Sequence, residues 1–211
     1  RNSLKNRYIA EVLMGRKFLV VSFAVSLLFS VVRADEWAQH GHDSQRTGCS
    51  SESPDEPWTF KWHWQPASMT SGVPQAPHPV TGGACIYMPV GSQGLYAINK
   101  TNGTQAWRNT QATFNASPAY DPSTGKLFAG ASNGNLYRIN AANGSIEATY
   151  SAASAINTEI LLAGQYVYAV TDSGVLHKVN TGTMQSAWTY NAGAGGATCA
   201  SYSASRDILI F

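Results

Sequence analysis

The sequence predicts an all-β propeller built from four-stranded repeats. A pattern of glycine, apolar and aromatic residues that ends in asparagine occurs three times, and the aligned asparagines are Asn99, Asn140 and Asn180. They define a repeat of about 40 residues, a period typical of solenoids, propellers and repeat arrays. The short strand-like segments inside each unit favour the propeller among these architectures.

Each unit divides into four short strands joined by tight turns. In the second unit the expected strands are 116–120, 126–131, 136–140 and 146–150. The intervening turns contain Pro and Gly at 121–125 and Asn-Gly at 133–134 and 143–144, as such turns require. The same division covers 76–110 and 157–192, and a fourth unit begins near Thr198. We therefore expect three blades and part of a fourth over 76–211. Because this number of blades cannot close a ring, the natural protein is expected to be longer.

Residues 14–34 have the pattern of a secretory signal peptide. Arg16 and Lys17 precede an uncharged apolar run over 18–32, and small residues at Val32 and Ala34 suit cleavage after Ala34. An uncleaved anchor or a buried strand is the alternative interpretation, although the run is short for a membrane span. We expect this segment to be helical and residues 1–13 to be translated leader sequence. The mature protein is then secreted, extracellular or periplasmic, with no membrane span.

The charge of the mature part differs from that of the whole chain. The formal net charge of the chain is +2, but residues 1–34 hold six of its 14 basic and one of its 12 acidic residues. The mature part therefore carries a net charge of −3. No cluster of Lys or Arg remains in it, so nucleic acid is not expected as a partner.

Residues 35–75 form a segment ahead of the blades. Within it, Trp58, Phe60, Trp62 and Trp64 alternate with polar residues, which predicts a half-buried strand like the last strand of a blade. The open alternative is an aromatic surface that stacks on sugars or bases.

The first repeat contains the spacing Ala97-x-Asn99-x-x-x-Gly103-x-x-x-Trp107. This resembles the tryptophan-docking motif of the PQQ-like (quinoprotein alcohol dehydrogenase-like) repeat family, and residues 37–48 resemble the stretch that opens such propellers. The resemblance implies that Trp107 packs on the second blade, against the backbone near Gly144. It implies the same role for Trp188 toward the fourth blade.

The motif is incomplete in the later repeats. The second repeat keeps Asn140 and Gly144, but Arg138 replaces the alanine and Ala148 replaces the tryptophan. The third keeps Asn180 and Trp188, with Lys178 in place of the alanine and Met184 in place of the glycine. We therefore expect the interface between the second and third blades to be less well filled than the first.

The resembled family contains two kinds of protein. Some members are dehydrogenases of alcohols or sugars that hold pyrroloquinoline quinone (PQQ) between a Trp and a disulfide of adjacent cysteines, with Ca²⁺ bound nearby. Others resemble a scaffold lipoprotein of bacterial outer-membrane assembly. The cysteines here are Cys49, Cys85 and Cys199, and none are adjacent. We favour a secreted, non-catalytic scaffold that binds a protein or glycan at its blade loops, with no catalytic residue or cofactor assigned. The alternative is a PQQ- and Ca²⁺-dependent dehydrogenase whose site lies largely in missing blades.

Other candidate sites have simpler interpretations. His40, His42 and Asp43 could be metal ligands, but two histidines with no cysteine or further histidine nearby are better explained as a capping or turn segment, and no metal site is predicted. The odd cysteine count leaves disulfide pairing open, and small buried hydrophobes are an equal interpretation. Four glycosylation sequons occur, with Asn102 and Asn143 in turns as the better candidates and Asn99 expected to make a structural hydrogen bond. Pro118 follows the fourth candidate, Asn115, and disfavours its modification.

Overall fold

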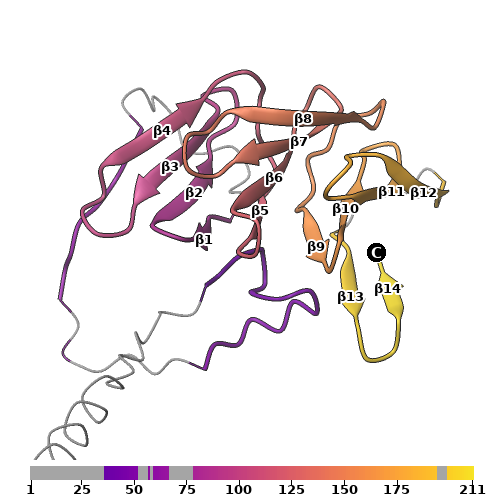
Figure 1. Ribbon diagram of the computed structural model, residues 1–211, viewed down its shortest axis with the longest axis horizontal. Helices are drawn as coiled ribbons and strands as arrows, with labels where there is room; N and C mark the ends of the chain where they lie inside the picture. Colours follow the sequence, from indigo (N-terminus) through magenta and orange to yellow (C-terminus); the bar gives the residue numbers. More distant parts are fainter. Residues whose placement is uncertain (1–35, 52–56, 58, 67–77, 194–198) are drawn as a thin grey trace, which may run out of the picture. The chain divides into compact units, whose positions relative to one another are not determined.

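The computed structural model describes residues 36–51, 57, 59–66, 78–193 and 199–211, and their regular structure consists of β-strands (Figure 1). The first blade contains β1 (Val80–Gly82), β2 (Cys85–Pro89), β3 (Leu95–Asn99) and β4 (Gln105–Asn109). The second contains β5 (Ala119–Asp121), β6 (Lys126–Gly130), β7 (Asn135–Asn140) and β8 (Ile146–Ser151). The third contains β9 (Leu161–Ala163), β10 (Tyr166–Val170), β11 (Val175–Asn180) and β12 (Ser186–Asn191). A further pair consists of β13 (Ser201–Ser203) and β14 (Ile208–Ile210).

Each blade is an antiparallel sheet whose strands follow one another in chain order. The pair β13–β14 forms a separate two-stranded sheet. Strands pair within a repeat and not between repeats, which confirms the predicted fold of three four-stranded blades and part of a fourth.

The repeated asparagine closes the turn between the third and fourth strands of each blade. The carbonyl of Asn99 accepts from the Gly103 amide at 2.9 Å, and that of Asn140 accepts from the Gly144 amide at 2.8 Å. Asn180 makes the same bond with Met184 at 2.8 Å. The residue after each turn has a positive φ, +71° at Gly103 and +76° at Gly144, where glycine is unstrained. Met184 adopts φ +54° there, which costs a side-chain-bearing residue about 1–2 kcal/mol.

The hydrophobic core lies between blades. One cluster joins the first and second blades and includes Leu95, Trp107, Leu127 and Tyr137. A second joins the second and third blades through residues such as Phe128, Leu136, Val167 and Val179. Blades in a propeller bury their faces only against each other, so these clusters supply the stabilising contacts of the fold.

Residues 37–48, which we call the opening segment, cross the first strand of every blade in turn. The carbonyls of Trp37 and Ala38 accept from Thr81 in β1 and Tyr120 in β5. The Gln39 side chain makes two bonds with the backbone of Leu162 in β9. The Ser44 carbonyl then accepts from Tyr202 in β13. The opening segment therefore ties the blades together across their first strands.

The prediction of an aromatic strand is wrong for the part that the structure describes. Residues 59–66 belong to no strand, and no backbone hydrogen bond joins them to another described residue. A strand needs a ladder partner, and the alternation of side chains alone does not supply one. The predicted alternation is partly retained, because Trp62 and Trp64 are half-buried against the first blade whereas Phe60 is 81% exposed.

The predicted leader, signal helix and Trp58 lie outside the described residues. None of the described segments includes a helix with the length and hydrophobicity needed to cross a membrane.

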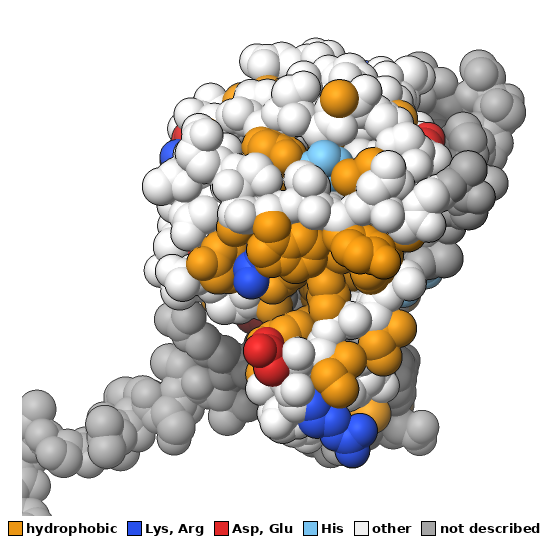
Figure 2. All heavy atoms as spheres, turned by 90° about the vertical axis from the view of Figure 1, so that its right-hand side faces the viewer, with side chains coloured by type: hydrophobic (Ala, Val, Ile, Leu, Met, Phe, Trp, Pro, Cys, Tyr) orange, Lys and Arg blue, Asp and Glu red, His pale blue; other side chains and the backbone are white. Residues whose placement is uncertain are grey.

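Large apolar side chains are exposed at the C-terminal end of the described chain. Figure 2 shows hydrophobic side chains gathered on the face where β12 and β14 lie. The exposed members are Trp188, Tyr190, Ile208, Ile210 and Phe211. A groove of about 690 Å³ lies among them, lined also by Leu176 and Leu209.

Candidate functional site

The residues of the repeat motif meet at the interface between the first and second blades. Trp107 of β4 is 8% exposed, and its Nε1 donates to the Ala141 carbonyl at 2.9 Å. A Cβ added to Gly144 would lie 2.5 Å from the indole ring, so only glycine permits this approach. Ala97 pairs with Trp107 across the first blade and is fully buried. The structure thus places Trp107 against Gly144.

Trp62 makes the same contact with the first blade. Its Nε1 donates to the Lys100 carbonyl at 2.9 Å, and a Cβ on Gly103 would lie 2.6 Å from its ring. Lys100 follows Asn99 as Ala141 follows Asn140, so the two acceptors occupy equivalent positions. The alternation of aromatic residues predicts Trp62 only as part of a half-buried strand and does not reveal this docking role. The signal that could have found it is the pairing of each docking tryptophan with the turn glycine of the following blade.

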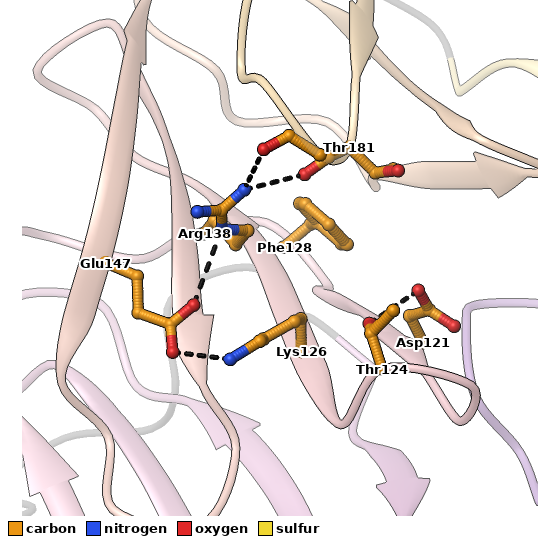
Figure 3. A pocket seen from close by; sticks show the side chains of 8 residues that line it. Asp121, Thr124, Lys126, Phe128, Arg138, Glu147 and Thr181 are labelled. Carbon is orange, nitrogen blue, oxygen red and sulfur yellow. Dashed lines mark hydrogen bonds and ion pairs between the residues drawn. The ribbon is translucent and has the colours of Figure 1, made fainter.

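Between the second and third blades an arginine, at the position of the motif alanine, donates to the carbonyl that corresponds to the tryptophan's acceptor (Figure 3). Arg138 of β7 donates from one terminal nitrogen to the carbonyls of Thr181, at 3.0 Å, and Gly182. Thr181 follows Asn180, so its carbonyl is equivalent to the acceptor of Trp107. Glu147 lies 3.4 Å from Arg138 Nε and also pairs with Lys126. The hydrogen bond from Lys126 is the main cause that lowers the pKa of the Glu147 carboxyl.

A cavity of about 300 Å³ lies at this interface. Its lining residues, drawn in Figure 3, are Asp121, Thr124, Lys126, Phe128, Arg138, Glu147, Thr181 and Gly182. Ala148, at the position of the tryptophan, packs instead against the core between the second and third blades. The Asp121 carboxylate accepts from Ser123 and Thr124, and the other charged groups pair with one another. These pairs lie within the second blade, and the bonds from Arg138 to the Thr181 and Gly182 carbonyls join it to the third.

Trp188 lacks the docked environment of Trp107. It is 40% exposed, with its ring edge-on to Tyr168 at 6.3 Å and Lys178 Nζ at 5.8 Å from its centroid. The Asn180 side chain accepts from the amides of Gly182 and Thr183 and so supports the turn.

Two of the three residues considered as metal ligands lie together and the third lies elsewhere. Nδ1 of His42 is 3.9 Å from Oδ2 of Asp43. The Asp43 carboxylate accepts from the Thr47 amide at 3.0 Å and from its hydroxyl, as in a capping turn. The His42 ring lies edge-on to Trp37 at 5.0 Å. His40 points elsewhere, with its ring centroid 4.1 Å from that of His78. Burial, and then the charge of His78, lower the pKa of His40.

The cysteines lie in different parts of the fold. Cys85 is in the core of the first blade, where burial raises the pKa of its thiol, whereas Cys49 is exposed. Cys199 is half-buried just before β13, and all three thiols are free. PQQ in the resembled dehydrogenases rests on a disulfide of adjacent cysteines, so these residues do not fit that cofactor.

The four sequon asparagines differ in whether the side-chain amide nitrogen donates a hydrogen bond. That of Asn99 donates to Thr104, and that of Asn115 donates to Ser132 and Asn157. Asn102 and Asn143 use only their side-chain oxygens, which accept from Thr104 and Ser145. Their amide nitrogens, which would carry a glycan, make no hydrogen bond to a described residue.

Comparison with known proteins supports the repeat assignment. A family model described as outer membrane protein assembly factor BamB matches residues 30–206. A comparison with curated protein sequences gave no match.

Solved structures similar to the chain include three dehydrogenases. A quinohemoprotein alcohol dehydrogenase from Pseudomonas putida HK5 aligns with a TM-score of 0.64 and 13% identity, over 83% of this chain and 34% of that chain. The quinohemoprotein alcohol dehydrogenase from Comamonas testosteroni aligns with a TM-score of 0.58 and 16% identity, over 75% of this chain and 27% of that chain. A europium-containing methanol dehydrogenase aligns with a TM-score of 0.58 and 15% identity, over 74% of this chain and 31% of that chain. The chain thus spans about a third of the length of these proteins, and at these identities the likeness shows the fold. Together with the family match over most of the sequence, it establishes that the chain belongs to the PQQ-like repeat family of β-propellers.

Proposed function

We propose that the chain is part of a secreted, non-catalytic β-propeller that acts as a binding scaffold for a protein or glycan. The observation that carries the proposal is that the motif side chains serve contacts between blades. Trp62, Trp107 and Arg138 each donate to a backbone carbonyl of the following blade. These residues build a rigid ring segment and leave the loops between strands free for a partner.

The description of the matching family supports a scaffold. It names an outer membrane protein assembly factor, a protein that works by contact with other proteins. The signal-peptide pattern over 14–34 supports secretion, to the periplasm or the cell exterior.

Dehydrogenase activity has less support. The dehydrogenases similar to this chain share its fold at 13–16% identity, and fold does not determine chemistry. The cysteines of this chain do not fit PQQ, as described above.

The two functions are separated by an assay of the full-length protein purified from the secreted fraction. PQQ is titrated with and without Ca²⁺, and turnover is measured with alcohols and sugars and an artificial electron acceptor. We expect neither a spectral change of PQQ nor turnover, together with a mature N-terminus after Ala34 and cross-links to a stable partner that fall in blade loops. Turnover with PQQ and Ca²⁺ would overturn the scaffold proposal.

A further inference from the structure

Three side chains that are distant in sequence meet beside the opening segment. His40 belongs to that segment, His78 precedes β1, and Glu159 precedes β9. Their potential ligand atoms all lie within 4.8 Å of one another. None of the hydrogen bonds or ion pairs among the described residues involves either imidazole or the Glu159 carboxylate. Each side chain therefore has its donor atoms available for a ligand.

The backbone at each of the three residues is held by specific bonds. The buried Ser117 accepts from the His78 amide at 2.6 Å through its hydroxyl and from the Ile160 amide at 3.0 Å through its carbonyl. A single residue thus fixes the chain at His78 and next to Glu159. The His40 carbonyl accepts from Arg46 at 2.8 Å, and the neighbouring Gln39 is bonded to β9. The backbone that carries the three side chains is therefore held before any ligand binds.

We propose that His40, His78 and Glu159 form a binding site for a divalent transition metal, with zinc as the ion that fits them best. Imidazole nitrogens and carboxylate oxygens are normal zinc ligands, at about 2.0–2.2 Å, and two His with one Glu is a known zinc ligand set. Calcium and magnesium prefer oxygen ligands and do not suit two imidazoles. Zinc imposes no geometry through its d electrons, so it tolerates ligands that come from three separate segments.

Binding requires a small rearrangement of side chains. Ligands at these bond lengths around a tetrahedral ion lie about 3.3 Å apart, so the donor atoms must approach by roughly 1–2 Å. His78 is exposed and can move by rotation about its side-chain bonds, while the half-buried His40 and Glu159 keep their places. Three protein ligands leave one position of the ion open to water or to a group of a partner.

The charges that face His40 bear on how tightly a cation binds. They are those of His78, Glu159 and Arg46, and among them only Glu159 favours a bound cation. The charge of Arg46 also opposes the metal, so we expect moderate rather than very tight affinity.

The test uses the full-length mature protein, purified without a polyhistidine tag and treated with EDTA. Zinc chloride is titrated by calorimetry at about pH 7.5, and thermal unfolding is followed with and without the ion. Cobalt(II) is added in parallel, because its visible absorption reports coordination by nitrogen. We expect one ion per chain and a rise in melting temperature when the ion is bound.

Substitutions identify the ligands. His78→Ala and Glu159→Gln should each weaken zinc binding by about 10-fold or more and abolish the cobalt spectrum. His63→Ala is the matched control, because His63 is exposed elsewhere and should leave binding unchanged. His78 is exposed and Glu159→Gln keeps its shape, so both variants should melt like the wild type in EDTA. The proposal is overturned if the wild type binds no zinc, or if both variants bind it as the wild type does.

Discussion

The contact between Trp107 and Gly144 gives the sharpest prediction for stability. Trp107→Ala in the full-length protein removes an indole that is 8% exposed, and with it about 150 Å² of buried surface. At about 25 cal/mol per Å², the loss in unfolding free energy is ~4 kcal/mol, within the usual 3–5 kcal/mol for such truncations. The Ala141 carbonyl keeps a hydrogen bond from Tyr87 at 3.3 Å, so we add no large penalty for an unpaired acceptor.

A substitution at Gly144 tests the same contact independently, because an added Cβ would clash with the indole of Trp107. Gly144→Ala places a Cβ 2.5 Å from the indole and also strains a residue at φ +76°. Gly125→Ala is the matched control, because Gly125 has φ +66° but no atom within 4 Å of its added Cβ. The control should cost only about 1 kcal/mol for the backbone strain, and Gly144→Ala clearly more.

Chemical denaturation of the single and double variants tests this reasoning. In the Trp107→Ala background the clash is gone, so Gly144→Ala should cost about as little as the control does. Equal costs of Gly144→Ala in the two backgrounds would refute the docking geometry. So would a Trp107→Ala variant that unfolds at the same denaturant concentration as the wild type.

Three further predictions concern other parts of the chain. Arg138→Met should lower the unfolding free energy by about 1–2 kcal/mol, because the Thr181 carbonyl loses its charged donor. Chemical denaturation measures this, and an unchanged unfolding free energy would contradict the docking role of the arginine. His177 is buried and its pKa is lowered by burial, so the unfolded state takes up the proton first and stability should fall as the pH drops below about 6.5. His177→Tyr should flatten this slope in melting curves recorded between about pH 7 and pH 5, and an unchanged slope would assign it to other groups. If the protein is made in a eukaryotic secretory pathway, glycopeptide mapping should find glycans at Asn102 and Asn143; occupancy confined to Asn99 or Asn115 would contradict the hydrogen-bond argument.

The sequence predicts the blades well because their signals are local. Turn residues and strand alternation lie within a few positions of each other, and the asparagine that ends each third strand forms its turn bond within four residues. The aromatic segment shows the limit of such signals. Trp62 and Trp64 alternate as strand residues do, yet the ladder that would make a strand depends on residues elsewhere in the chain.

The candidate metal site could not be predicted from neighbouring residues either, because its three side chains are distant in the sequence. His40, His78 and Glu159 are brought together because the opening segment crosses the first strands of successive blades. Along the sequence, His40 is grouped with its neighbours His42 and Asp43 instead. His42 and Asp43 do lie together, with Nδ1 of the imidazole 3.9 Å from Oδ2 of the carboxylate, but His40 lies against His78 instead.

The three docking contacts explain how a repeat can lose its motif and keep its packing. The turn after the third strand presents the same backbone carbonyl in each blade, at Lys100, Ala141 and Thr181. That acceptor is a property of the backbone, so it persists when side chains change. The donor can then vary, as an indole in two contacts and a guanidinium in the third. Because the guanidinium fills less space than an indole, the third contact retains the hydrogen bond but leaves the cavity beside Phe128. In the second repeat of this chain, the loss of the tryptophan therefore changes the donor and keeps the hydrogen bond to the next blade.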